Sequence, residues 1–100
     1  MSDPVQFTDV PLETPIQREG GAIDMLKLRR PKSGDLRGVS IAKLGQLDYD
    51  EVRKVLPRIT TPPLVEFEVD QIDVADQLEI SGAIADFLFT KRRKAELQTM

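Results

Sequence analysis

The chain lacks cysteine and histidine altogether. Without cysteine no disulfide can form, so the sequence gives no sign of an oxidising compartment. Without either residue, the usual zinc, copper and iron sites and the histidine-dependent nucleophiles are excluded. We therefore expect a protein that is not an enzyme and that holds no cofactor and no metal. A reaction carried by carboxylates and a metal ion is left open.

Long hydrophobic runs are also missing. No apolar stretch approaches the roughly 18 residues that a membrane-spanning helix needs. The first residues, Met-Ser-Asp-Pro-Val, have neither the basic start nor the apolar segment of a signal peptide. We therefore expect a cytosolic protein that does not associate with a membrane.

What the chain does contain suits one small folded domain. Its 100 residues are 40% hydrophobic and 31% charged, a balance typical of a folded and helix-rich chain. Aromatic residues make up only 5% of the chain. The sequence therefore predicts a thin core built mainly from leucine, isoleucine and valine.

The charges are unevenly distributed along the chain. Residues 61–90 carry seven acidic side chains and no lysine or arginine. Lys91, Arg92, Arg93 and Lys94 follow directly, although the net charge is −3. A surface polarised in this way favours oriented contacts with a charged partner.

Residues 10–30 predict a β-hairpin. The first strand, 10–18, contains Pro11 and Pro15, which each remove a backbone donor and favour the edge of a sheet. Gly20-Gly21 predicts the turn, because both residues accept positive φ. In the returning strand, 22–30, apolar residues alternate with basic ones.

Residues 33–90 predict four or five short helices. Two short pieces are expected at 34–39 and 40–47. A third helix is expected to begin at Asp48, with Glu51 completing a capping box and Pro57 ending the helix near Leu56. Thr61 is expected to cap a helix over 62–69. Asp73 is expected to cap the last helix, in which Gly82 is a point where the axis can kink.

The predicted fold class is therefore α+β: an N-terminal β-hairpin followed by a small bundle of four or five short helices, mainly helical. The expected domain plan has a flexible arm at 1–9, a single small domain at 10–90 and a basic tail at 91–100. Within the domain, the hairpin occupies 10–30 and the helices occupy 33–90.

Two segments suggest ligand chemistry without matching it well. Asp48 to Glu51 superficially resembles a calcium-binding loop, but Val52 and Arg53 stand where that loop needs a ligand and a glycine. Helix capping explains these acids better.

The stretch from Lys27 to Arg37 holds five basic side chains, which can neutralise phosphates. A small nucleic-acid-binding or regulatory protein is therefore the alternative function, although no aromatic lies between Phe7 and Tyr49 in the sequence to give a stacking platform beside the patch.

The segment 80–89 is apolar around most of a helical wheel. An ordinary surface helix buries one stripe, so a helix that is apolar this far round must be covered on more than one side. One interpretation is a central core helix packed between the others. The other is a partner-binding or self-association surface, with these candidate residues: Ile80, Ile84, Phe87, Leu88 and Phe89.

Several segments resemble a known family in their order and spacing. The segments are Arg30-Pro31-Lys32-Ser33-Gly34-Asp35-Leu36-Arg37-Gly38, Leu56-Pro57-Arg58-Ile59-Thr60 and the preceding hairpin from Thr14 to Leu28. They resemble the phage tail assembly chaperones of the E-protein type, from contractile-tailed bacteriophages. The resemblance runs from about Val10 to Phe89, so the tail after Thr90 lies outside it.

The resemblance implies a function and its partners. Such a protein binds the tape measure protein, a long helical chain, and keeps it soluble until tail tube subunits polymerise around it. It acts in the host bacterial cytoplasm and is not retained in the virion. A ribosomal frameshift in many such phages yields a longer second product, which is a further expected partner. The function we expect is therefore binding of another protein, and self-association is left open.

Overall fold

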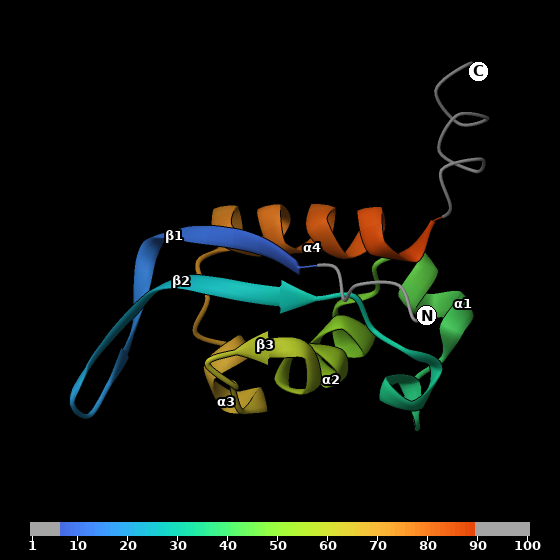
Figure 1. Cartoon of the computed structure of the whole chain (residues 1–100), viewed down its shortest axis with the longest axis horizontal. Coiled ribbons are helices and arrows are strands. Elements are labelled where there is room, and N and C mark those ends of the chain that lie inside the picture. Colours follow the sequence, from blue (N-terminus) through green and yellow to red (C-terminus); the bar gives the residue numbers. More distant parts are fainter. Residues whose placement is uncertain (1–6, 90–100) are drawn as a thin grey trace, which may run out of the picture.

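The described part of the chain contains a three-stranded antiparallel sheet, to which its N-terminal hairpin contributes two strands (Figure 1). The computed structural model describes residues 7–89. Strand β1 (Phe7–Arg18) pairs with β2 (Gly21–Arg29), and β2 pairs with the short β3 (Thr60–Thr61). The order is β1-β2-β3, so β1 lies at an edge of the sheet, as its prolines predict.

The turn between β1 and β2 depends on two glycines. Gly20 has a φ of 85° and Gly21 a φ of 149°, values that side chains other than glycine rarely adopt. Strand β1 also begins at Phe7, so the expected arm over residues 1–9 is too long. Residues 1–6 lie outside the described residues.

The central part of the sheet has one buried and one exposed face. Val10 lies opposite Leu26, and both side chains are buried. On the other face, Asp9 lies opposite Lys27, and both are exposed. Residues that are directly opposite in an antiparallel pair share a face, so this alternation directs the apolar side chains toward the helices.

Within residues 7–89, three helical segments lie between β2 and β3, and two follow β3. They are a 3-10 turn, η1 (Ser33–Leu36), and the helices α1 (Ile41–Gly45), α2 (Tyr49–Ile59), α3 (Glu66–Val69) and α4 (Val74–Leu88). Helix α4 runs beside β1, whereas α2 and α3 lie toward β3 (Figure 1). The α+β class is therefore confirmed, with a sheet of three strands in place of a hairpin alone.

Local capping signals place two of the helices correctly. The Asp48 side chain accepts a hydrogen bond from the backbone N–H of Asp50 at the start of α2. The Asp73 side chain accepts one from Ala75 at the start of α4. The prediction of a capping box at Asp48 is wrong. The Glu51 carboxylate does not reach back to the backbone of Asp48 but accepts a hydrogen bond from the backbone N–H of Ser40, 3.0 Å away.

Two predicted helix boundaries are also wrong. Helix α2 continues through Pro57 to Ile59, whose side chain is buried in the core. Burial of Ile59 offsets the one backbone hydrogen bond that the proline removes. The expected helix over 62–69 is shorter, because Thr60 and Thr61 pair with β2 and α3 begins only at Glu66.

The core is a single cluster of apolar side chains from the sheet and the helices. Its fully buried members include Leu26 and Leu28 of β2, Val52 and Leu56 of α2, and Ile84 of α4. Leucine, isoleucine and valine dominate it, as the composition predicts. Helix α4 is therefore fixed against the sheet along its whole inner side, and Gly82 does not break it.

Candidate functional site

The five candidate partner-binding residues do not form one exposed surface. Ile80 and Ile84 are 0% exposed and Phe87 is 6% exposed. Leu88 and Phe89 remain partly exposed at the end of α4. The interpretation of this segment as a core helix therefore explains Ile80, Ile84 and Phe87, because a thin core needs all three to cover the sheet.

The exposed apolar side chains of α4 lie on its outer side. Val74 is 72% exposed and Leu78 is 69% exposed. They are four residues apart and so lie one turn apart on the same face. The sequence pattern contained both residues but gave no means of telling which stripe of an almost entirely apolar helix faces outward.

A groove lies between α4 and the edge strand β1. Its volume is about 840 Å³, and its walls come from residues 8–13 of β1 and from α4. Leu78 and Gly82 are among the α4 residues that line it. Gly82 has an open outer side, since no atom beyond its chain neighbours and the adjoining helix backbone lies within 4 Å of the position a Cβ would take. The groove is therefore open to a side chain of another molecule.

A buried carboxylate holds the two walls together. The two oxygens of Asp76 on α4 accept hydrogen bonds from the backbone N–H groups of Glu13 and Thr14 on β1, each at 3.0 Å. Asp76 is only 2% exposed. The register of β1 is irregular between Pro11 and Ile16, so these N–H groups need a partner other than β2. Asp76 supplies it and fixes the spacing of the groove walls.

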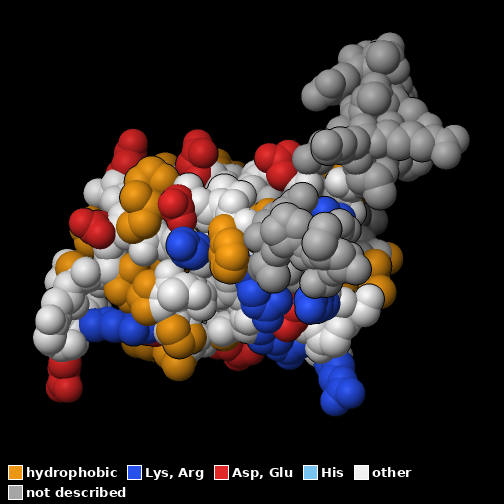
Figure 2. All heavy atoms as spheres, viewed as in Figure 1, with side chains coloured by type: hydrophobic (Ala, Val, Ile, Leu, Met, Phe, Trp, Pro, Cys, Tyr) orange, Lys and Arg blue, Asp and Glu red, His pale blue; other side chains and the backbone are white. Residues whose placement is uncertain are grey.

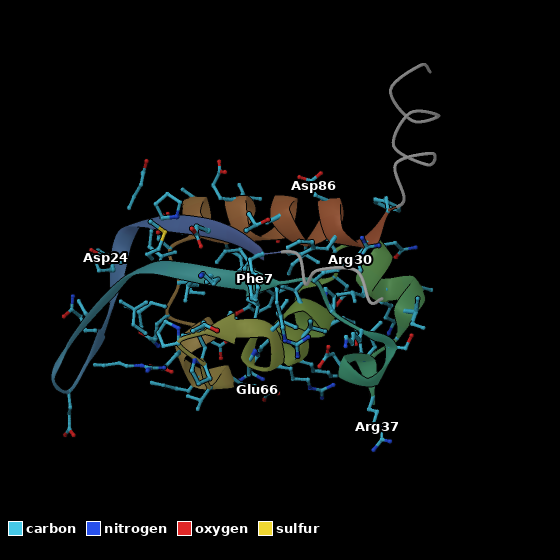
Figure 3. All side chains as sticks on the ribbon, in the orientation of Figure 1. Phe7, Asp24, Arg30, Arg37, Glu66 and Asp86 are labelled. Carbon is cyan, nitrogen blue, oxygen red and sulfur yellow. The ribbon has the colours of Figure 1, made fainter. Side chains whose placement is uncertain are left out.

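The groove is strongly acidic. Five of the thirteen lining residues carry carboxylates: Asp9, Glu13, Asp76, Glu79 and Asp86. None of the thirteen is lysine or arginine. Acidic side chains stand along the edge formed by α4, with hydrophobic side chains beside them (Figure 2), and Asp86 points away from the sheet (Figure 3). This arrangement favours a partner with basic and apolar side chains.

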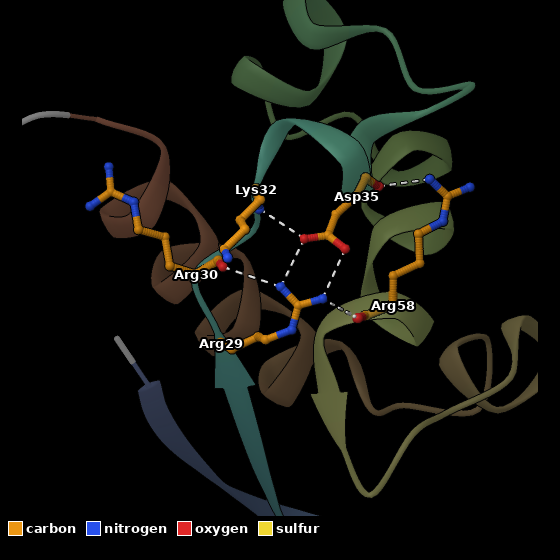
Figure 4. A network of polar contacts seen from close by, with 5 residues as sticks. All are labelled: Arg29, Arg30, Lys32, Asp35 and Arg58. Carbon is orange, nitrogen blue, oxygen red and sulfur yellow. Dashed lines mark hydrogen bonds and ion pairs between the residues drawn. The ribbon is translucent and has the colours of Figure 1, made fainter. Parts of the chain in front are cut away.

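The basic stretch from Lys27 to Arg37 is largely engaged in contacts within the chain (Figure 4). Arg29 pairs with Asp35 and also donates to the backbone carbonyl of Arg58. Lys27 lies over the ring of Phe7, 5.3 Å from its centroid. The Arg29 guanidinium, together with the Lys32 backbone N–H, lowers the pKa of Asp35 to about 2 despite its partial burial. The stretch therefore acts mainly as a structural connection.

A second ionic cluster joins α2 to α3. The Arg53 guanidinium donates to both carboxylate oxygens of Asp70, at 2.9 and 3.0 Å, and to Glu66. The Tyr49 hydroxyl donates to Asp70 at 2.7 Å. Burial and the Asp70 carboxylate raise the pKa of Tyr49 to about 12, and Arg53 lowers the pKa of Asp70. Each of these groups has a partner, so the cluster is structural.

Residues 7–89 contain neither a cluster suited to a metal ion nor a membrane-spanning helix. No group of three acidic side chains in this range is placed to hold a metal ion. No helix in the same range is long and apolar enough to cross a membrane.

Comparison with known proteins identifies the family. A family model described as phage tail assembly chaperone proteins, E, or 41 or 14, matches residues 9–88. Tail assembly protein E of Escherichia phage P2 is 37% identical over 79 residues, which cover 79% of this chain and 87% of that protein. Tail assembly protein E' of the same phage is also 37% identical over 79 residues, which cover 56% of its length. No solved structure matches the chain. The resemblance seen in the sequence is thus confirmed, and the chain belongs to the phage tail assembly chaperone family.

Proposed function

We propose that this chain is a tail assembly chaperone that binds the tape measure protein and keeps it soluble until tail tube subunits polymerise around it. The observation that carries the proposal is the family match over residues 9–88, which spans almost the whole described fold. The E-type family implies this client.

The geometry supports binding in preference to catalysis. Titratable clusters such as Arg53 with Asp70 are engaged in contacts within the chain. The groove beside α4 and the exposed Val74 and Leu78 remain available on the surface. A long helical client has apolar stripes that need cover, and burying them is favourable by about 25 cal/mol per Å².

We also propose that a longer product shares the domain of this chain and that both proteins act in the same compartment. The chain matches 79 residues of both E and E' of phage P2, which are 87% of E and 56% of E'. This supports the idea that a longer product shares the same domain. We place both in the host bacterial cytoplasm and expect neither in the mature virion.

Co-expression tests the proposal. The tape measure protein of the same phage is expressed in bacteria alone, with this chain, or with an Ile84→Asp variant whose core is disrupted. The soluble fraction of the tape measure protein is then measured after centrifugation. The proposal predicts that only the intact chain increases the soluble fraction and that the two proteins co-purify. Equal solubility with and without the chain would refute it.

A further inference from the structure

The groove between β1 and α4 has the shape of a docking site. Its walls are fixed by the Asp76 hydrogen bonds to Glu13 and Thr14, so it exists before a partner arrives. Gly82 on one wall has open space where any other residue would place a side chain. The 69% exposed Leu78 also lines the groove and supplies an apolar contact.

The charge of the groove defines the chemistry of its occupant. Among residues 7–89, five carboxylates and no basic side chain line it. Asp76 is already bound by the β1 backbone, but the exposed Asp9, Glu13 and Glu79 would lose water to a neutral or acidic partner without compensation, which is costly. A partner with lysine or arginine would pair with them and would also be attracted before contact.

The backbone of β1 argues against an added strand as the occupant. Strand addition needs free backbone donors and acceptors at the sheet edge. Pro11 has no N–H, and Asp76 already binds the N–H groups of Glu13 and Thr14. An occupant that contacts side chains through one face, as an amphipathic helix does, fits the edge better.

We propose that the β1–α4 groove binds a basic amphipathic helix of the client, with its apolar face on Leu78 and Gly82 and its basic side chains against the flanking carboxylates. This inference rests on the proposed function and names the site and the client segment. Docking then buries Leu78, and its affinity falls as salt rises.

Two labelled peptides test the site directly. One is an amphipathic helix of leucine and lysine, and the other replaces every lysine by glutamate. Binding to the full chain is followed by fluorescence anisotropy. We expect the lysine peptide to bind and the glutamate peptide to bind at least about tenfold more weakly. Equal binding of both peptides would overturn the proposal.

Matched variants test whether binding occurs in the groove. Gly82→Phe fills the open space, whereas Gly82→Ala adds only a methyl group and serves as its control. Glu79→Lys reverses a charge in the groove, and Asp24→Lys reverses one on β2 outside it (Figure 3).

We expect Gly82→Phe and Glu79→Lys each to weaken binding of the lysine peptide by about tenfold or more. Both controls should bind within about twofold of the native chain. Circular dichroism checks that each variant is folded, and equal binding by Gly82→Phe and Gly82→Ala would overturn the proposal.

Two further readouts separate this inference from the proposed function. If the native chain and Gly82→Phe solubilise the tape measure protein equally, the groove is not the client site although the proposed function stands. If the native chain fails to solubilise it, the proposed function fails and the peptide measurements still decide the chemistry of the groove. Sedimentation tests self-association: a dimer that Gly82→Phe converts to a monomer would show a second copy as the occupant and overturn the proposal.

Discussion

The guanidinium of Arg29 pairs with the carboxylate of Asp35 through two hydrogen bonds, each 2.8 Å long. The pair joins the end of β2 to η1. The Asp35 carboxylate also accepts from the backbone N–H of Lys32, and Arg58 on α2 donates to the backbone carbonyls of Asp35 and Arg37. One of the segments that carry the family resemblance is thus a turn fixed by charge-assisted hydrogen bonds.

Removing the charge of Asp35 is expected to lower the free energy of unfolding and to make this free energy less dependent on pH. The pKa of Asp35 is lowered from 3.8 to about 2, so its contribution is complete above about pH 4 and is lost as the pH falls toward 2. We expect Asp35→Asn to lower the free energy of unfolding at pH 7 by about 1–2 kcal/mol, a moderate value because the pair is partly exposed.

Chemical denaturation of the native chain and of Asp35→Asn at several pH values measures this effect. The difference between the two should shrink between pH 4 and pH 2. Asp24→Asn, at an exposed position without this pair, is the control. A difference that stays constant down to pH 2 would contradict the assigned role of Asp35.

Asp76 is expected to be important for stability because it binds the backbone of β1. In Asp76→Ala the N–H groups of Glu13 and Thr14 lose their acceptor, so we expect the free energy of unfolding to fall by about 1–3 kcal/mol. Hydrogen exchange should show faster exchange at these two amides in particular. Asp73→Ala removes the α4 cap and serves as the comparison, because it should leave exchange at Glu13 and Thr14 unchanged.

The inner and outer sides of α4 should differ sharply in their response to truncation. Ile84 is fully buried, so Ile84→Ala creates a cavity and is expected to cost about 2–5 kcal/mol of stability. Leu78→Ala removes an exposed side chain and should change stability by less than about 0.5 kcal/mol. Thermal or denaturant unfolding measures both, and similar losses would show that Leu78 is not on the outer surface.

The basic stretch is expected not to support nucleic-acid binding. Arg29 is occupied by Asp35 and Lys27 lies over Phe7, so Arg29 and Lys27 are not grouped on one open patch for phosphates. The chain should therefore pass through a heparin or DNA column at physiological salt. Retention that disappears steeply as salt rises would revive the alternative function.

Local signals in the sequence predicted much of the fold. Pro11 and Pro15 indicated an edge strand, and Asp48 and Asp73 indicated helix starts, because each of these effects depends on residues close in the chain. The pairing of Thr60 and Thr61 with β2 could not be predicted. That strand has only two residues, and its partners, Lys27 and Leu28, are distant in the sequence.

The candidate site was harder to predict than the fold. The hydrophobicity of 80–89 indicated that α4 is important but did not show which of its sides the sheet would cover. The link between Asp76 and Glu13 spans 63 residues, and an aspartate in the first helical turn is usually explained by the helix dipole alone. Gly82 indicated a kink, whereas in the folded chain it leaves one wall of the groove open.

Complementation of a phage that lacks this gene tests the central claim most directly. The chain is supplied from a plasmid, tailed particles are counted by electron microscopy, and the purified virions are analysed by mass spectrometry. We predict that tails form only when the chain is supplied and that the virions do not contain it. Normal tails without the chain, or virions that contain it as a regular component, would contradict its assignment as a tail assembly chaperone.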